Sequence, residues 1–127
     1  IAIFDLYIGK VEFIKNGAMP TFIKNGKNIE VINNESLPAG LVNDLKLVVH
    51  DTEIKENDII VMCSDGIIES NKEKREKWIK ELLEKIKINT SQKIADIILQ
   101  EAIDNNYGKP KDDMSVIVAK ISSTSKI

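Results

Sequence analysis

The chain has 127 residues, of which 43% are hydrophobic and 30% are charged, and its formal net charge is -2. This length suits one domain or most of one, and the slightly negative charge gives no electrostatic reason to expect binding to nucleic acid or to an anionic membrane surface. No apolar run approaches the roughly 20 residues that a transmembrane helix needs, and no signal peptide is readable. The single cysteine, Cys63, excludes an internal disulfide and favours a cytoplasmic protein.

The first half of the sequence has the pattern of short β-strands separated by turns. β-Branched and aromatic residues recur in short runs, and glycine, proline and asparagine separate them. The dipeptide Asn25-Gly26 is a strong signal for a tight hairpin. The strands predicted in this way cover residues 2–8, 11–15, 21–23, 28–32, 45–49 and 59–62. We expect the first four to form an antiparallel meander, followed by a loop over residues 33–44, and a turn over residues 56–58 before the last of these strands.

The second half changes to a helical period. Ser70 and Glu73 fit a capping box that would begin a first helix, and Thr90 or Ser91 would cap a second, which Gly108 is well placed to end. The helical spacing is carried by Trp78, Ile79, Leu82, Leu83, Ile86, Ile94, Ile97, Ile98 and Ala102. A last strand follows. The predicted fold class is therefore α+β, a mainly antiparallel sheet with two consecutive helices before the last strand.

Two acidic segments carry most of the functional information. Asp65 lies just after the apolar run over residues 59–62, and Asp112 and Asp113 lie just before the apolar run over residues 116–119. If these two strands are adjacent and antiparallel, the carboxylates meet at one edge of a sheet, where they could bind a hard divalent cation. Because Asp112 and Asp113 are neighbours in an extended chain, only one of them is expected to face a given site. Taken alone, each segment also fits an ordinary solvated turn.

Other sites do not fit the spacing. An EF-hand loop with Asp65 at its fifth position would need ligands from Val61 and Lys72, and neither residue can serve. His50 is the only histidine, and neither a zinc-type Cys/His cluster nor a Ser-His-Asp order accompanies it, so we assign it no special role. Cys63 is interpreted as a small core thiol.

The sequence around the acidic segments resembles the last two acidic motifs of the metal-dependent, PPM-type protein serine/threonine phosphatases. The matching segments are Val61-Met62-Cys63-Ser64-Asp65-Gly66-Ile67 and Asp112-Asp113-Met114-Ser115-Val116-Ile117-Val118-Ala119. Two further segments sharpen the resemblance to the phosphatase domain of the stage II sporulation protein E family, namely Gly17-Ala18-Met19-Pro20-Thr21-Phe22-Ile23-Lys24 and Leu37-Pro38-Ala39-Gly40-Leu41. The similarity runs over essentially the whole chain.

The resemblance implies an α-β-β-α sandwich around two manganese or magnesium ions, which activate a water molecule for attack on a phosphoserine or phosphothreonine. Asp65 and Asp112 match metal ligands of the family. Asp113 occupies a position that is Asn in many relatives, so we treat it as supporting. No catalytic residue is implied beyond the metal ligands. The implied substrate in spore formers is a phosphorylated anti-sigma factor antagonist.

The family's bridging Asp and the Gly beside it have no counterpart in this sequence. The chain also starts at Ile1, inside an apolar run, where a natural domain usually begins with a frayed polar segment. We therefore expect residues 1–127 to be the C-terminal portion of a single phosphatase domain whose N-terminal portion is absent, and the sandwich to be partial.

Further expectations follow for the fragment. Cation binding should be weak or absent, activity should be small, and the exposed sheet should promote self-association. The fragment is expected to be cytoplasmic and not to span a membrane, and the resemblance implies a membrane-anchored parent. The alternative is a non-catalytic interaction module on the same scaffold.

Overall fold

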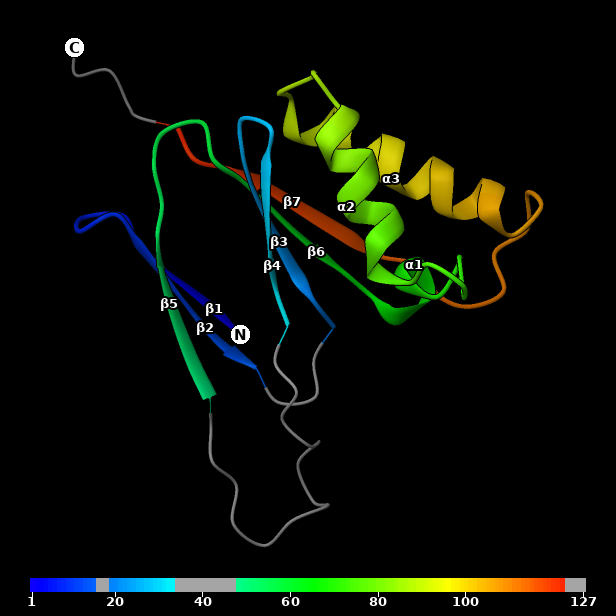
Figure 1. Ribbon diagram of the computed structural model, residues 1–127, viewed down its shortest axis with the longest axis horizontal. Coiled ribbons are helices and arrows are strands. Elements are labelled where there is room, and N and C mark those ends of the chain that lie inside the picture. Colours follow the sequence, from blue (N-terminus) through cyan, green and yellow to red (C-terminus); the bar gives the residue numbers. More distant parts are fainter. Residues whose placement is uncertain (16–18, 34–47, 123–127) are drawn as a thin grey trace, which may run out of the picture.

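The computed structural model describes residues 1–15, 19–33 and 48–122, which form two antiparallel β-sheets with helices covering one of them (Figure 1). The three-stranded sheet has the order β1-β2-β5 and consists of β1 (Ala2–Asp5), β2 (Lys10–Lys15) and β5 (Val48–Glu53). The four-stranded sheet has the order β4-β3-β6-β7 and consists of β4 (Asn28–Ile32), β3 (Thr21–Asn25), β6 (Ile59–Cys63) and β7 (Val116–Lys120). The described helices are α1 (Asp65–Ile68), α2 (Glu76–Lys85) and α3 (Ser91–Asn105). None of these helices is long and apolar enough to cross a membrane.

This architecture confirms the predicted α+β class, with α2 and α3 in succession before the last strand. The described part of the chain supplies both sheets and one helical layer of the predicted sandwich. The predicted meander is wrong in one respect, because β1 and β2 form one hairpin, β3 and β4 form another, and the two hairpins lie in different sheets. The strand expected over residues 45–49 is β5, which extends further toward the C-terminus. Residues 34–47 lie outside the described residues, as do residues 17–18 of the resemblance segments.

The central strands β3 and β6 of the four-stranded sheet are buried on both faces, which explains the continuous apolar run of β6. Ile59 and Val61 face the helices, whereas Ile60 faces the other sheet, as the two-residue period of a strand requires. The core under the helices consists of Phe22, Ile59, Val61, Ile67, Ile68, Trp78, Ile79, Leu83, Ile94, Ile98 and Ala102. The core between the sheets consists of Val11, Phe13, Ile23, Ile32, Ile54 and Ile60. The central strand β6 therefore contributes to two separate cores.

The predicted capping box at Ser70 is wrong. α2 begins at Glu76, and Arg75 precedes it with a positive φ of 52°. Ser70 is buried, and its hydroxyl donates to the carbonyl of Ile67 at 2.8 Å and accepts from the side-chain amide of Asn105 at 3.2 Å. Ser70 thus joins the end of α1 to the end of α3, and its hydroxyl is not available to start α2.

The boundaries of α3 follow the prediction more closely. Thr90 is its N-cap residue, although the threonine side chain makes no capping hydrogen bond. At the other end, the N–H of Tyr107 donates to the main-chain carbonyl of Asp104, and the N–H of Gly108 donates to that of Ile103, both at 3.0 Å. These two hydrogen bonds are the pattern of a Schellman motif. Gly108 therefore takes part in the C-terminal cap of α3, while Tyr107, with φ of 57°, occupies the left-handed position nearest the helix.

Lys24 fastens the helical layer to the sheet. Its side chain is buried on β3, and its ammonium group donates a hydrogen bond of 2.5 Å to the carbonyl of Leu83. This carbonyl belongs to the last turn of α2, where carbonyl groups have no partner within their own helix. Burial lowers the pKa of Lys24, and the nearby carboxylate of Glu84 opposes that shift. The buried cation therefore fixes the C-terminal end of α2 on the sheet.

The two acidic segments meet where β6 passes into α1. Cys63 pairs with Val116 in the ladder between β6 and β7, so the residues beyond this pair leave the sheet at the same edge. Gly66 then lies directly against the chain that leads into β7, because a β-carbon placed on Gly66 would be 2.2 Å from the carbonyl oxygen of Asp113. The close approach of this neighbouring backbone is the reason for glycine at position 66.

We expect Gly66→Ala to lower the free energy of unfolding by roughly 2–3 kcal/mol, because the added methyl group must displace the main chain of Asp113. Urea unfolding followed by circular dichroism measures this loss. Gly26→Ala is the matched control, since a β-carbon there meets nothing within 4 Å and only the positive φ of 60° opposes it. That strain costs about 1 kcal/mol. Equal losses in the two variants would contradict the packing argument.

A buried hydroxyl at the start of β3 leads to a second expectation. Thr21 is 1% exposed, and its hydroxyl has no hydrogen-bond partner among the described residues. Because an unpaired buried hydroxyl costs about 1–3 kcal/mol and valine has nearly the same shape, Thr21→Val should raise the free energy of unfolding by about 1 kcal/mol. Thr52→Val, at a half-buried position of β5, is the control and should change it by less than about 0.5 kcal/mol. A less stable Thr21→Val variant would mean that the hydroxyl is paired.

Candidate functional site

The predicted ligands Asp65 and Asp112 lie at the same end of the four-stranded sheet. Asp65 is the first residue of α1, directly beyond β6, and Asp112 lies in the connection between α3 and β7. A β-carbon on Gly66 would be 3.5 Å from the β-carbon of Asp112, so the residue next to Asp65 is in contact range of Asp112. The expectation that adjacent antiparallel strands bring both acidic segments to one edge is confirmed. Their role as metal ligands stays a prediction.

Both candidate carboxylates are exposed, and each is oriented by its own main chain. The Oδ1 atom of Asp65 accepts a hydrogen bond of 2.9 Å from the N–H of Gly66, and that of Asp112 accepts one of 2.8 Å from the N–H of Asp113. Asp113 takes part through its backbone, because its carbonyl oxygen lies against Gly66 and accepts a hydrogen bond of 3.4 Å from the hydroxyl of Ser64. The side chain of Asp113 remains without an assigned role as a ligand.

A hollow of about 190 Å³ opens beside Asp112 and contains charges of both signs. Its walls come from the chain after α1, from the end of α3 and from the connection to β7. The lining residues are Gly66, Glu69, Ser70, Lys72, Asn106, Lys111 and Asp112. Asp65 does not line the hollow, which therefore lies to one side of the candidate ligand pair. Lys72 and Lys111 bring positive charge close to the acidic segments.

The donor set fits part of a divalent-cation site. The carboxylates of Asp65 and Asp112 are hard oxygen ligands, the kind that Mg²⁺ and Mn²⁺ prefer. Within residues 1–15, 19–33 and 48–122, however, no group of three or more His, Cys, Asp and Glu side chains is arranged so that it could hold a metal ion. The described part of the chain thus supplies two candidate metal ligands and not a complete set of ligands.

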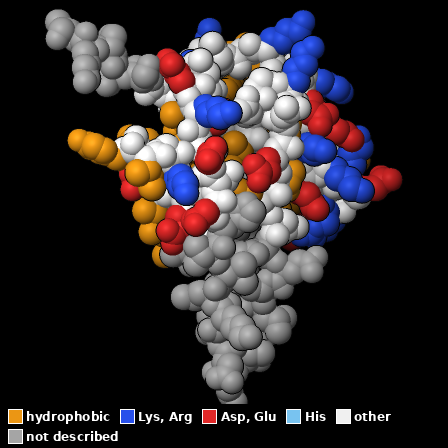
Figure 2. All heavy atoms as spheres, turned by 60° about the vertical axis from the view of Figure 1, so that its left-hand side comes forward, with side chains coloured by type: hydrophobic (Ala, Val, Ile, Leu, Met, Phe, Trp, Pro, Cys, Tyr) orange, Lys and Arg blue, Asp and Glu red, His pale blue; other side chains and the backbone are white. Residues whose placement is uncertain are grey.

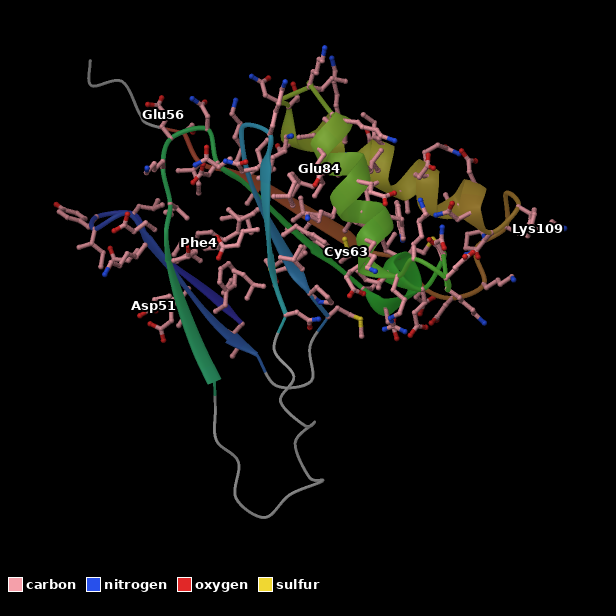
Figure 3. All side chains as sticks on the ribbon, viewed as in Figure 1. Phe4, Asp51, Glu56, Cys63, Glu84 and Lys109 are labelled. Carbon is pink, nitrogen blue, oxygen red and sulfur yellow. The ribbon has the colours of Figure 1, made fainter. Side chains whose placement is uncertain are left out.

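Two other residues considered from the sequence, Cys63 and His50, are not part of the candidate metal site. Cys63 is at the end of β6, beneath the helices, and packs against the helix-side core (Figure 3). Burial raises the pKa of its thiol to about 12, so the thiol stays protonated at neutral pH, as a core thiol should. His50 belongs to β5, in the other sheet, where it pairs with Phe13.

Ser64 is the residue of this site that the sequence interpretation missed. Its N–H donates to the carbonyl of Ser115 at 2.9 Å, and its hydroxyl accepts from the N–H of Ser115, also at 2.9 Å. Ser64 therefore joins the two acidic segments directly. The only available signal was a hydroxyl residue placed between an apolar strand and an Asp-Gly pair.

Comparison with known proteins connects this geometry to a family. The sequence profile of stage II sporulation protein E (SpoIIE) matches residues 1–122. Stage II sporulation protein E of Priestia megaterium is 37% identical over 123 residues, which are 95% of this chain and 21% of that protein. The protein of the same name from Bacillus subtilis (strain 168) is 35% identical over 123 residues, again 95% of this chain, and 15% of that protein. The chain thus spans about a fifth or less of these relatives.

A solved structure gives the corresponding match in three dimensions. The Mn-presoaked phosphatase domain of the cell fate determinant SpoIIE from Bacillus subtilis superposes with a TM-score of 0.85 at 32% sequence identity. The superposition covers 100% of this chain and 57% of that domain structure. With its profile match, its two acidic segments at one sheet edge and this superposition, the chain belongs to the stage II sporulation protein E family.

Proposed function

We propose that residues 1–127 are the C-terminal portion of a PPM-type, metal-dependent serine/threonine protein phosphatase domain, with Asp65 and Asp112 as ligands to Mn²⁺ or Mg²⁺. The observation that carries this proposal is the contact between the two acidic segments at Gly66, beyond the paired ends of β6 and β7. Family membership supports it, as does the likeness to the solved, Mn-presoaked phosphatase domain.

The complete domain would hold two ions, which lower the pKa of a bound water and neutralise phosphoryl oxygens. In this chain, Asp65 and Asp112 would contribute the carboxylate oxygens that their main-chain hydrogen bonds leave over. Lys72 and Lys111 would add positive potential beside the acids, which attracts a dianionic phosphate group. We propose no catalytic residue beyond the metal ligands.

The isolated chain is expected to show little or no phosphatase activity, because two carboxylates hold a divalent cation only weakly. A manganese-dependent assay with p-nitrophenyl phosphate tests this, alongside a chimera in which these residues replace the matched part of the Bacillus subtilis phosphatase domain. The chimera should be active, and Asp65→Asn or Asp112→Asn should lower its rate by roughly 100-fold or more, by removing a metal ligand. Asp113→Asn is the control and should stay within a few-fold of the parent chimera.

Two outcomes would contradict this account. Robust manganese-dependent hydrolysis by the isolated chain, abolished by Asp65→Asn, would overturn the expectation of an inactive fragment. A chimera that is folded by circular dichroism and keeps its activity after Asp65→Asn or Asp112→Asn would overturn the ligand assignment.

As the substrate of the parent protein we propose a phosphorylated anti-sigma factor antagonist, dephosphorylated by a cytoplasmic domain of a membrane-anchored protein. The sporulation proteins among the relatives support this assignment. The active chimera should release phosphate from this phosphoprotein faster than from an unrelated phosphoserine peptide, and equal rates would argue against the substrate.

A non-catalytic interaction module on the same scaffold is the second candidate, and the incomplete donor set among the described residues is compatible with it as well as with the first. A folded chimera that binds the phosphoprotein without hydrolysing it, at any manganese concentration, would support this candidate over the enzyme.

We further propose that the chain self-associates through the open side of its sandwich. Within the described ranges, β1 and β7 each pair with one strand only, so both are edge strands. Hydrophobic side chains gather along one rim of the molecule (Figure 2). Phe4 of β1 is 38% exposed and Ile117 of β7 is 67% exposed. A groove of about 380 Å³ is lined by Phe4, Leu6, Ala119, Lys120, Ile121 and Ser122.

A second copy of the chain is the occupant that this groove and these edges would suit, because strand edges pair with strand edges. The groove beside Phe4 lies away from Cys63, as Figure 3 illustrates, whereas Ile117 pairs with Met62, next to the pair Cys63 and Val116.

Sedimentation velocity tests the association. The wild-type chain should form dimers at tens of micromolar, about the affinity of modest homodimers. Ile117→Lys should give monomers by introducing a charge at the edge, whereas Ile88→Lys, at a position after α2 that is 43% exposed, should leave the dimer intact. A strictly monomeric wild-type chain would contradict the proposal.

A further inference from the structure

Ser64 occupies an unusual place in the ladder between β6 and β7. Beyond the pair Cys63 and Val116, the next residues across the strands are Ser64 and Ser115. The N–H of Ser64 donates to the carbonyl of Ser115 at 2.9 Å, which is one half of an antiparallel hydrogen-bonded pair. The other half would run from the N–H of Ser115 to the carbonyl of Ser64.

That carbonyl is already engaged in the first turn of α1. It accepts hydrogen bonds from the N–H groups of Ile67 and Ile68, at 3.1 and 3.3 Å. The N–H of Ser115 instead donates to the Ser64 hydroxyl at 2.9 Å. The side chain thus replaces the carbonyl in the ladder, at the point where the strand becomes a helix.

The same hydroxyl also reaches the acidic segment that precedes β7. It donates to the carbonyl oxygen of Asp113 at 3.4 Å, while accepting from Ser115. Ser64 is the N-cap residue of α1, but its side chain makes no capping hydrogen bond to that helix. Both hydrogen bonds of the Ser64 hydroxyl are therefore made with the segment that precedes β7.

We propose that Ser64 is a positioning residue, whose hydroxyl holds the segment from Asp112 to Ser115 against α1 and so sets the spacing between Asp65 and Asp112. The role requires a group that donates and accepts at once, which serine and threonine provide and alanine does not. The metal-related part of this inference rests on the proposed function, whereas the structural part stands on the ladder geometry alone.

The structural part is tested by amide hydrogen exchange of the full 127-residue chain, measured by NMR for Ser64→Ala, Ser64→Thr and the control Ser91→Ala. Ser91 is a half-buried serine at the start of α3, far along the chain from the site. Loss of one hydrogen bond should speed exchange of the Ser115 amide by roughly tenfold in Ser64→Ala. Ser64→Thr and Ser91→Ala should each change it by less than about twofold. Unchanged exchange at Ser115 in Ser64→Ala would overturn the proposal.

The metal-related part is tested by Mn²⁺ titration of the same variants, with paramagnetic broadening of the Gly66 and Asp113 amide signals as the readout, which detects weak binding. In the wild-type chain both signals should broaden together. Ser64→Ala should need roughly tenfold more Mn²⁺, as loss of a supporting partner of a metal ligand usually does. Faster exchange at Ser115 with an unchanged Mn²⁺ requirement would overturn the role in spacing the carboxylates. A wild-type chain with no broadening at either amide would overturn the metal-related part for this chain, whereas the chimera assay would still decide the proposed function and the exchange result the structural role.

Discussion

The antiparallel pairing of β6 with β7 is the interaction on which the candidate site depends. Its register places Cys63 opposite Val116, and the residues beyond that pair leave the sheet together as the two acidic segments. A shift by one residue would turn every side chain of a strand to the opposite face. The relative position of Asp65 and Asp112 is therefore fixed by strand register before any carboxylate chemistry is involved.

The register itself is held by packing on both faces of the sheet. Ile60 lies in the core between the sheets, whereas Val61, the next residue, lies in the core under the helices. A slipped β6 would have to exchange these two environments. Lys24 adds a polar restraint at the other end of the layer, because its buried ammonium group is bonded to the last turn of α2. The register that brings the acidic segments to one edge is thus held by hydrophobic packing, and Lys24 fixes the helical layer on the same sheet.

Local sequence signals predicted the features that depend on local structure. The apolar run of β6, the Asn25-Gly26 hairpin and the apolar stripe of α3 each followed from their own residues. The features that sequence reasoning missed depend on distant partners. The separation of the two hairpins into different sheets depends on β2 pairing with β5, and the false cap at Ser70 arose because its hydroxyl binds Asn105, 35 residues further along.

In the candidate site, too, some features could be predicted from the sequence and others depend on distant partners. Adjacent strands with acids at their ends were sufficient to predict that Asp65 and Asp112 share an edge, because that conclusion needs only topology. The ladder position of Ser64 could not be predicted, since it depends on a carbonyl that is withdrawn into a four-residue helix too short to show a period. Taken alone, the segment around Asp65 also fitted an ordinary turn, whereas the constraint on Gly66 is the carbonyl of Asp113, which lies close only after the two strands have paired.

The way in which the acids are held has a chemical consequence. Each of Asp65 and Asp112 uses one oxygen to accept the N–H of the following residue, so each carboxylate is oriented by the chain that carries it. Among the described residues neither forms an ion pair with a lysine or arginine, although Lys72 and Lys111 line the neighbouring hollow. An ion pair would have oriented the acids equally well, but it would have neutralised the charge that attracts a cation. Orientation by main-chain amides keeps that charge and leaves an oxygen of each carboxylate available, at the edge to which strand pairing brings both candidate ligands.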